Sequence, residues 1–90
     1  MIVKITNFDE NSDIPYIDYE VYGLLPSQMN FLNENLAEET SVDGDILNVR
    51  VCFRDIFPFQ SDVAKIRLDD FIAREEIEMN VFLSSFLEDM

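Results

Sequence analysis

The sequence lacks most of the groups on which enzyme chemistry depends. Its 90 residues include no His, no Trp, a single Cys and only two Gly. Without His, the commonest general base and metal ligand is missing, and the lone Cys has no His with which to form an activated nucleophile. The isolated glycines Gly23 and Gly44 do not form a Gly-rich phosphate loop. We therefore expect a protein that is not an enzyme and that holds neither a cofactor nor a metal ion.

The sequence also lacks the features of secreted and membrane proteins. Cys52 has no second Cys with which to form an internal disulfide, the usual staple of small secreted domains. The segment 1–7 lacks the apolar core of a signal peptide, and no apolar run approaches the length of a membrane span. We expect a cytoplasmic protein that makes no contact with a membrane, because acidic lipid headgroups would repel it.

Basic residues are the scarcest charged type. Six Lys and Arg stand against 19 Asp and Glu, which gives a formal net charge of −13 at pH 7. High net charge is typical of disordered chains, but here 48% of the residues are hydrophobic and 12% are aromatic, so we expect one folded domain over residues 1–90. A fold that tolerates this self-repulsion suggests a charge retained to bind a basic partner. The alternative is a charge kept for solubility, for example in a high-salt cytoplasm.

Alternating polar and apolar residues predict the strands. The segment 16–22 places three apolar side chains on one face: Ile17, Tyr19 and Val21. Its other face carries Tyr16, Asp18, Glu20 and Tyr22. The segment 46–54 alternates in the same way, with an apolar face of Leu47, Val49, Val51 and Phe53. A shorter strand is predicted over residues 2–6, and residues 42–45 are predicted to form a turn.

Apolar residues at helical spacing predict two helices. The first runs from an N-cap at Ser27 to about Glu39, with an apolar face of Leu25, Met29, Leu32 and Leu36. The second is capped by Asp69 or Asp70, and its apolar face consists of Met79, Phe82, Leu83, Phe86 and Met90. Residues 63–68 fit a strand and a helix equally well. The sequence therefore predicts an α+β domain, a mainly antiparallel sheet with two helices packed on it, in the order ββαβ(β)α.

Acidic residues gather on the two predicted helices and the N-terminal hairpin, whereas the segment 45–68 is nearly balanced in charge. A run of charge is usually a solvated face, but here the counter-charges that accompany such a face are absent. Tyrosines beside acids on the second predicted strand also suit an Arg-rich partner. We therefore expect the partner-binding residues to be Asp18, Glu20, Glu34, Glu38, Glu39, Glu75, Glu76 and Glu78.

In size, acidity and lack of catalytic groups, the chain resembles the small phage-encoded inhibitors that imitate DNA, including anti-restriction and anti-CRISPR proteins. No residue roles are carried over, because the resemblance is one of general character. It implies an inhibitor that presents a DNA-like negative surface to a nuclease or another nucleic-acid-binding protein. Two alternatives remain: an immunity protein or antitoxin that neutralises a basic toxin, and an acidic adaptor or structural phage protein. Direct binding of nucleic acid is not expected, because phosphates would be repelled.

The charge excess predicts that salt stabilises the fold. We expect the melting temperature to rise as NaCl increases to 1 M, because the Debye length falls from about 8 Å at physiological ionic strength to about 3 Å. Thermal unfolding followed by circular dichroism measures this. NaCl is preferred to sulfate, which stabilises most proteins through its exclusion from their surface. A flat or falling response would show that the acids are compensated locally.

Overall fold

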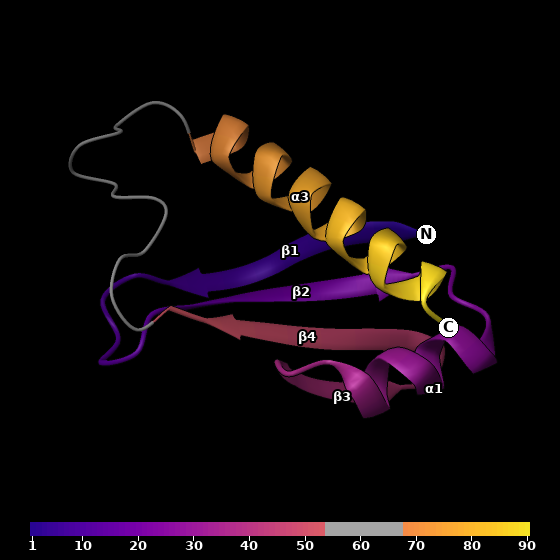
Figure 1. Cartoon of the computed structure of the whole chain (residues 1–90). Coiled ribbons are helices and arrows are strands. Elements are labelled where there is room, and N and C mark those ends of the chain that lie inside the picture. Colours follow the sequence, from indigo (N-terminus) through magenta and orange to yellow (C-terminus); the bar gives the residue numbers. More distant parts are fainter. Residues whose placement is uncertain (54–67) are drawn as a thin grey trace.

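The structure, a computed structural model, describes residues 1–53 and 68–90 (Figure 1). Within these residues, four strands and two helices follow one another in the order ββαββα, which confirms the predicted α+β class. The elements are β1 (Ile2–Asp9), β2 (Tyr16–Tyr22), α1 (Pro26–Asn35), β3 (Glu39–Asp43), β4 (Ile46–Cys52) and α3 (Leu68–Glu88).

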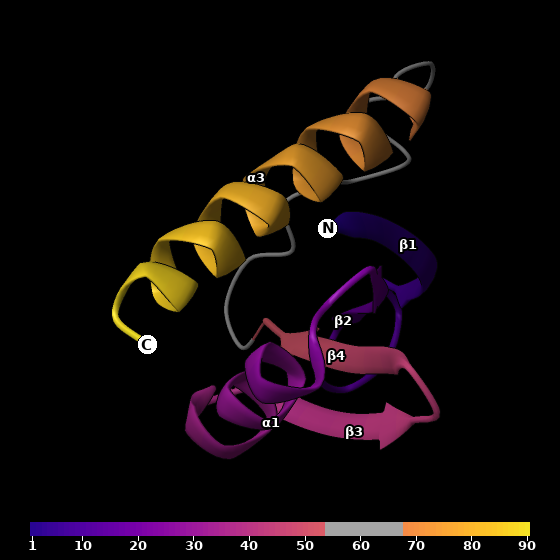
Figure 2. The ribbon, with the colours of Figure 1, turned by 90° about the vertical axis from the view of Figure 1, so that its right-hand side faces the viewer.

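The strands form one antiparallel sheet in the order β1-β2-β4-β3. Both helices lie on the same side of it (Figure 2). The predicted apolar faces of β2 and β4 are confirmed, because the side chains buried toward the helices include Ile17, Tyr19, Val21, Leu47 and Val49. The alternation of side chains along a strand places the polar residues of β2 and β4 on the other side, which we call the open face.

Strand β1 is longer than predicted and contains an irregularity. Its pairing with β2 shifts between Ile5 and Asn7, so one extra residue is inserted into β1. The insertion reverses the alternation and brings Phe8 to the helix side, opposite the buried Ile17. There the Phe8 ring meets the Phe71 ring at the start of α3 edge-on, with centroids 5.8 Å apart. The irregularity thus allows both halves of β1 to contribute to one core.

Helix α1 is shorter than predicted at its C-terminal end. It begins at Pro26, with the Gln28 side chain accepting a hydrogen bond from the Leu25 amide, so the expected N-cap at Ser27 is wrong. Its last turn is closed by Asn35, whose side-chain amide donates to the Phe31 carbonyl oxygen. The chain then becomes extended and enters β3, a strand that was not predicted: Glu39 was expected at the end of the helix, and residues 42–45 were expected to form a turn.

Strand β3 forms because its residues favour pairing over a longer helix. Thr40 and Val42 are β-branched and alternate, which suits an extended chain. The Thr40 hydroxyl donates to the backbone and side-chain oxygens of Asn33, at 3.2 and 2.8 Å, and so ties β3 to α1. A two-residue turn joins β3 to β4, and Gly44 adopts the positive φ of 62° that this tight turn needs.

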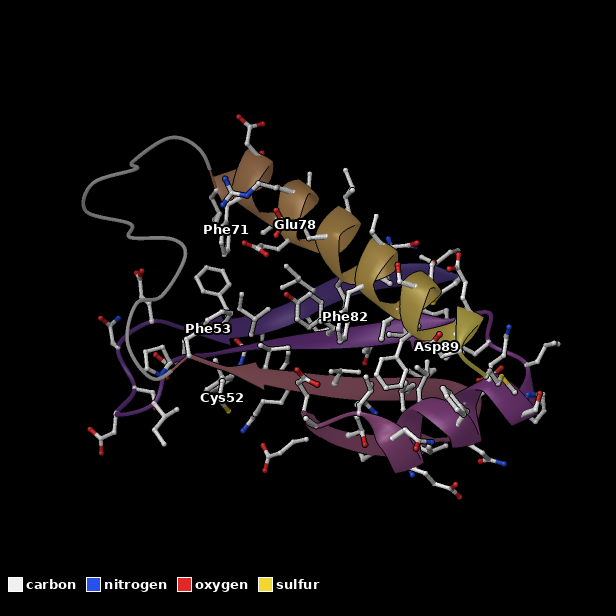
Figure 3. All side chains as sticks on the ribbon, viewed as in Figure 1. Cys52, Phe53, Phe71, Glu78, Phe82 and Asp89 are labelled. Atoms are coloured by element: carbon white, nitrogen blue, oxygen red, sulfur yellow. The ribbon has the colours of Figure 1, made fainter. Side chains whose placement is uncertain are left out.

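Helix α3 covers the sheet, and Phe71 points from its first turns toward the strands (Figure 3). Met79 and Leu83 are buried as predicted, whereas Phe82 and Met90 are largely exposed, so the predicted apolar face is correct only in part. Asp69 and Asp70 lie inside the first turn and are not its caps. Their charge there favours the helix dipole. The predicted end of β4 at Arg54 and most of the ambiguous segment 63–68 lie outside the described residues.

Leu83 supplies a test of this packing. We expect Leu83→Ala to lower the free energy of unfolding by about 2–5 kcal/mol, because the side chain is fully buried and its removal leaves a cavity. Urea unfolding measures the change. Val81→Ala on the same helix is the matched control and should change stability little, because Val81 is exposed. Equal effects of the two substitutions would contradict the orientation of α3.

Candidate functional site

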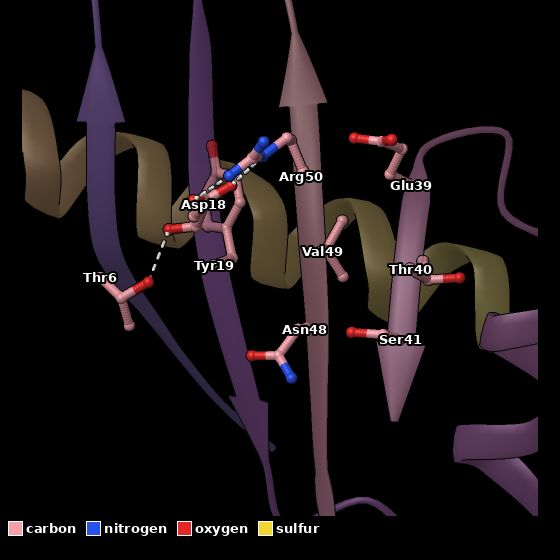
Figure 4. Close-up of a pocket in the computed structure, with 9 residues that line it drawn as sticks. All are labelled: Thr6, Asp18, Tyr19, Glu39, Thr40, Ser41, Asn48, Val49 and Arg50. Carbon is pink, nitrogen blue, oxygen red and sulfur yellow. Dashed lines mark hydrogen bonds and ion pairs between the residues drawn. The ribbon is translucent and has the colours of Figure 1, made fainter. Parts of the chain in front are cut away.

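The open face of the sheet carries the polar residues that were predicted on β2 (Figure 4). Asp18 lies directly opposite Arg50 of β4, and Glu20 lies opposite Asn48. Strand pairing therefore decides which charged groups meet on this face, because residues opposite each other in an antiparallel pair have Cβ atoms only about 5 Å apart.

Arg50 binds Asp18 through two hydrogen bonds. Its Nε donates to Asp18 Oδ1 at 2.7 Å, and its Nη2 donates to Oδ2 at 2.9 Å. The guanidinium also stacks over the Tyr16 ring, 4.0 Å from the ring centroid. The hydrogen bond to Asp18 raises the pKa of Arg50 above its usual value. The pair is solvated and adds little stability, but it neutralises Asp18.

Glu20 also has a partner within the chain. The Tyr22 hydroxyl donates a hydrogen bond to Glu20 Oε1. This bond to a carboxylate raises the pKa of Tyr22, with smaller contributions from burial and from the negative charge of Glu20. Both acids predicted on β2 thus accept hydrogen bonds from neighbouring side chains, and Asp18 is also neutralised by a cation.

Two shallow hollows flank Arg50. One, of about 380 Å³, has polar lining side chains that include Thr6, Asp18, Glu39, Ser41 and Asn48 (Figure 4). The other, of about 650 Å³, is lined by side chains that include Tyr16, Glu38, Glu39 and Cys52. Glu39 and Arg50 line both hollows. Carboxylates and hydroxyl or amide groups at their rims suit a cationic, hydrogen-bonding side chain of a partner.

The predicted partner-binding acids of α3 are not equally exposed. Glu75 lies on the helical face of Met79 and Phe86, and its side chain is only 12% exposed. Burial raises the pKa of Glu75, and the charge of Glu78 and a hydrogen bond between the two carboxyl groups raise it further. Arg74, 3.7 Å from Glu75, opposes this effect. Burial and these acids together raise the pKa of Tyr19 far above its usual range.

Glu76 satisfies the backbone of the sheet edge. Its Oε2 accepts a hydrogen bond of 2.8 Å from the Ile5 amide of β1. One turn further along α3, the Asn80 side chain donates to the Met1 carbonyl oxygen at 3.3 Å. Edge strands expose unpaired backbone groups that invite aggregation, and here helix side chains cover part of that edge. Glu76 thus has a structural role, and Glu78 is the most exposed of the three predicted acids on α3, since Glu75 and Glu76 are half-buried.

The remaining predicted acids lie at the opposite edge of the sheet. Glu34 is on α1, Glu38 is in the connection that follows, and Glu39 begins β3, so they do not share one helix as predicted. Asp43 and Asp45, which flank Gly44 in the turn after β3, were not among the predicted partner-binding residues. An Asp-Gly-Asp turn after alternating Thr40 and Val42 would have indicated a hairpin here. We define the β3 acidic edge as Glu34, Glu38, Glu39, Asp43 and Asp45.

The carboxylates of the β3 acidic edge have no hydrogen bond or ion pair within residues 1–53 and 68–90. Four of the five residues are exposed, and Glu38 is half-buried. No group of three or more His, Cys, Asp and Glu side chains in the described part of the chain is arranged to hold a metal ion. Cys52 is exposed and points away from α3 (Figure 3). Carboxylates are the charged groups that the β3 acidic edge presents to solvent.

The chain belongs to a family of unknown function (DUF5750), which matches residues 2–89. None of the curated proteins compared with the chain matches it. Neither helix in the described residues is long and apolar enough to cross a membrane.

Glu75 generates a prediction about pH. A carboxyl group whose pKa is raised by folding contributes stability at low pH, and this contribution is lost as the pH rises through the raised pKa. We therefore expect Glu75→Gln to raise the melting temperature at pH 7.5 by roughly 2–6 °C, and to have a smaller effect at pH 4. The measurement is thermal unfolding at both pH values.

Glu34→Gln is the matched control, because it removes the same charge from an exposed position. It should raise the melting temperature less, and with a weaker dependence on pH. A melting temperature of Glu75→Gln at or below that of the wild type at pH 7.5 would show that the Glu75 carboxylate is well compensated in the folded protein.

Proposed function

We propose that this protein inhibits a nucleic-acid-binding protein, such as a nuclease, by occupying its basic surface with carboxylates. The observation that carries the proposal is the excess of acid. Even if all six Lys and Arg paired with an acid, 13 of the 19 acidic side chains would have no cationic partner. A soluble surface normally mixes both signs, so an excess this large in a domain of 90 residues supports a polycationic partner.

The β3 acidic edge is the part of the surface that best supports this role. Between Lys4 and Arg50 the sequence contains ten acids and no Lys or Arg, and the five acids of the edge all lie in this interval. The bonds from Thr40 to Asn33 tie α1 to the start of β3, where Glu38 and Glu39 lie, and Asp43 and Asp45 follow at the other end of the strand. The neighbouring hollows, both lined by Glu39, offer places for Lys or Arg side chains of the partner.

The physical basis of inhibition is competition between two polyanions. A cleft that binds DNA attracts any concentrated negative charge, so association is fast and falls steeply with ionic strength. Rim carboxylates act mainly on the association rate. Once bound, the acidic surface would exclude the phosphate backbone from the same cations. Such an inhibitor would act in the cytoplasm, where we expect this protein to be.

The same electrostatic argument applies to two other classes of protein. An immunity protein or antitoxin would mask a basic toxin made by the same cell. An acidic adaptor or structural protein would bind a basic partner and leave its activity intact. Only the adaptor leaves the partner active, so a functional measurement on the captured partner separates it from the other two. The identity of the partner separates an immunity protein from an inhibitor of another kind.

We expect the triple variant Glu34→Gln, Glu38→Gln and Glu39→Gln to bind the partner about tenfold more weakly, mostly through slower association. The partner is first captured from cell lysate on immobilised wild-type protein and identified. Its affinity for the wild type and the variant is then measured by surface plasmon resonance at 150 mM NaCl. Raised salt should imitate the effect of the variant.

The matched control changes the same number of charges outside both proposed surfaces, through Asp9→Asn, Asp13→Asn and Asp89→Asn. If this control weakens binding as much as the triple variant does, net charge matters and the β3 acidic edge does not. If a partner saturated with the protein still binds and cleaves DNA normally, the protein is an adaptor and not an inhibitor. A captured toxin encoded beside the gene would identify an immunity protein.

A further inference from the structure

A groove runs between the start of β1 and the outer side of α3. It has a volume of about 430 Å³, and the residues that line it are mostly apolar: Met1, Ile2, Val3, Ala73, Glu76, Ile77, Asn80 and Val81. Three of its aliphatic side chains are strongly exposed: Ile2 at 57%, Ile77 at 64% and Val81 at 61%. Single exposed aliphatic residues are common, but a contiguous group of this kind marks an interaction surface.

The helical repeat shows that this apolar surface is separate from the core. Ala73, Ile77 and Val81 follow one another at intervals of four residues, so they lie on one line of α3. Met79 and Leu83 face the sheet from the other side of the helix. We call the outward line the α3 apolar stripe, and it gives the helix two apolar faces where a helix at the surface of a domain needs only one.

Acidic residues border the stripe at both ends. Asp70 lies three residues before Ala73 and Glu88 seven residues after Val81. With 3.6 residues per turn both lie on the side of the stripe, about 27 Å apart along the helix axis. Glu78 lies beside its centre and is exposed, whereas the nearby cation Arg74 is paired with Glu75. An apolar centre with a charged rim is the usual composition of a protein interface. The complementary surface is an apolar line bordered by basic residues.

We propose that the α3 apolar stripe, together with Ile2, docks an amphipathic helix of the basic partner, whose apolar side chains enter the groove while flanking Lys or Arg side chains meet Glu78 and Glu88. The inference rests on the proposed function, because it assumes that the partner is basic. It assigns the two surfaces different tasks. The β3 acidic edge accelerates encounter, and the apolar stripe lengthens the life of the complex.

Backbone contacts at β1 favour a helix over an added strand as the occupant. Strand addition needs unpaired backbone groups along the sheet edge. Here Glu76 accepts the Ile5 amide hydrogen, and Asn80 donates to the Met1 carbonyl oxygen. The edge beside the groove is therefore partly occupied, and what remains accessible is aliphatic side chains.

Charge argues against a second copy of the chain as the occupant. Symmetric antiparallel pairing of two α3 helices through the stripe would place Glu88 of one copy near Asp70 of the other at both ends. It would also bring together two chains that each carry a net charge of −13. Like charges placed opposite each other at an interface suppress association.

The test uses a synthetic probe of defined chemistry. The probe is an 18-residue peptide of Leu and Lys that forms an amphipathic helix, and the reference is a peptide of the same composition in scrambled order. We expect the wild-type protein to bind the amphipathic peptide at least tenfold more tightly than the scrambled one. In NMR titrations the amides of Ile2, Ala73, Ile77 and Val81 should shift most.

The double variant Ile77→Ser and Val81→Ser should lose this tenfold preference. The matched control is Leu25→Ser with Val42→Ser, which removes two exposed apolar side chains outside the groove and should keep the preference. Circular dichroism verifies that each variant is folded. If the variant at Ile77 and Val81 keeps the preference, the stripe is not the docking surface.

Other outcomes separate this inference from the proposed function. If both peptides bind the wild type equally well and salt abolishes binding, the electrostatic proposal stands and the apolar inference falls. If neither peptide binds even at low salt, the proposed function falls as well. If the wild type sediments as a dimer at micromolar concentration and the Ile77/Val81 variant as a monomer, the stripe serves self-association and the assignment to a partner is overturned.

Discussion

Mutual repulsion of the acidic side chains is the constraint on which the rest of this structure depends. A net charge of −13 opposes any compact state, so the apolar core must outweigh the repulsion, and the chain must place its acids where they do least harm. The structure does so by giving several carboxylates a hydrogen-bond donor within the fold. Asp18 accepts hydrogen bonds from the Arg50 guanidinium. Glu20 accepts one from the Tyr22 hydroxyl, and Glu76 accepts one from the Ile5 amide. These acids are part of the scaffold, whatever else the protein binds.

The sequence predicts only in part which acids have partners within the fold and which are exposed. Alternation fixed the two faces of β2 and β4, because a single residue of slippage would have exposed Ile17 and Val49. The burial of Glu75 was not predicted but could have been, because Glu75 precedes Met79 by four residues and therefore shares its buried face. The bond from Glu76 to the Ile5 amide could not have been predicted, because it joins residues 71 positions apart and depends on where α3 crosses the edge of the sheet.

The fold was also predicted in part, and each wrong prediction has an identifiable cause. Leu36 extended the helical pattern of α1 and concealed the change to strand at Glu39. Strand β3 carries only two β-branched residues and has acids at both ends, so its local preference for an extended strand is weak. Its pairing with β4 stabilises the strand nevertheless. The irregularity after Ile5 was invisible because an inserted residue reverses the alternation by which strands are recognised.

The two candidate binding surfaces lie at opposite edges of the sheet, beside β3 and beside β1. This separation suits the different ranges of the forces involved. Charge acts across a Debye length of about 8 Å, so in the proposed complex the β3 acidic edge would influence the approach of a partner before contact and would tolerate an imperfect fit. Burial of Ile77 and Val81 stabilises a complex only in direct contact, so it depends on shape. A protein with charge alone would bind every polycation, and an apolar stripe that docks one partner would provide a means of discriminating among them.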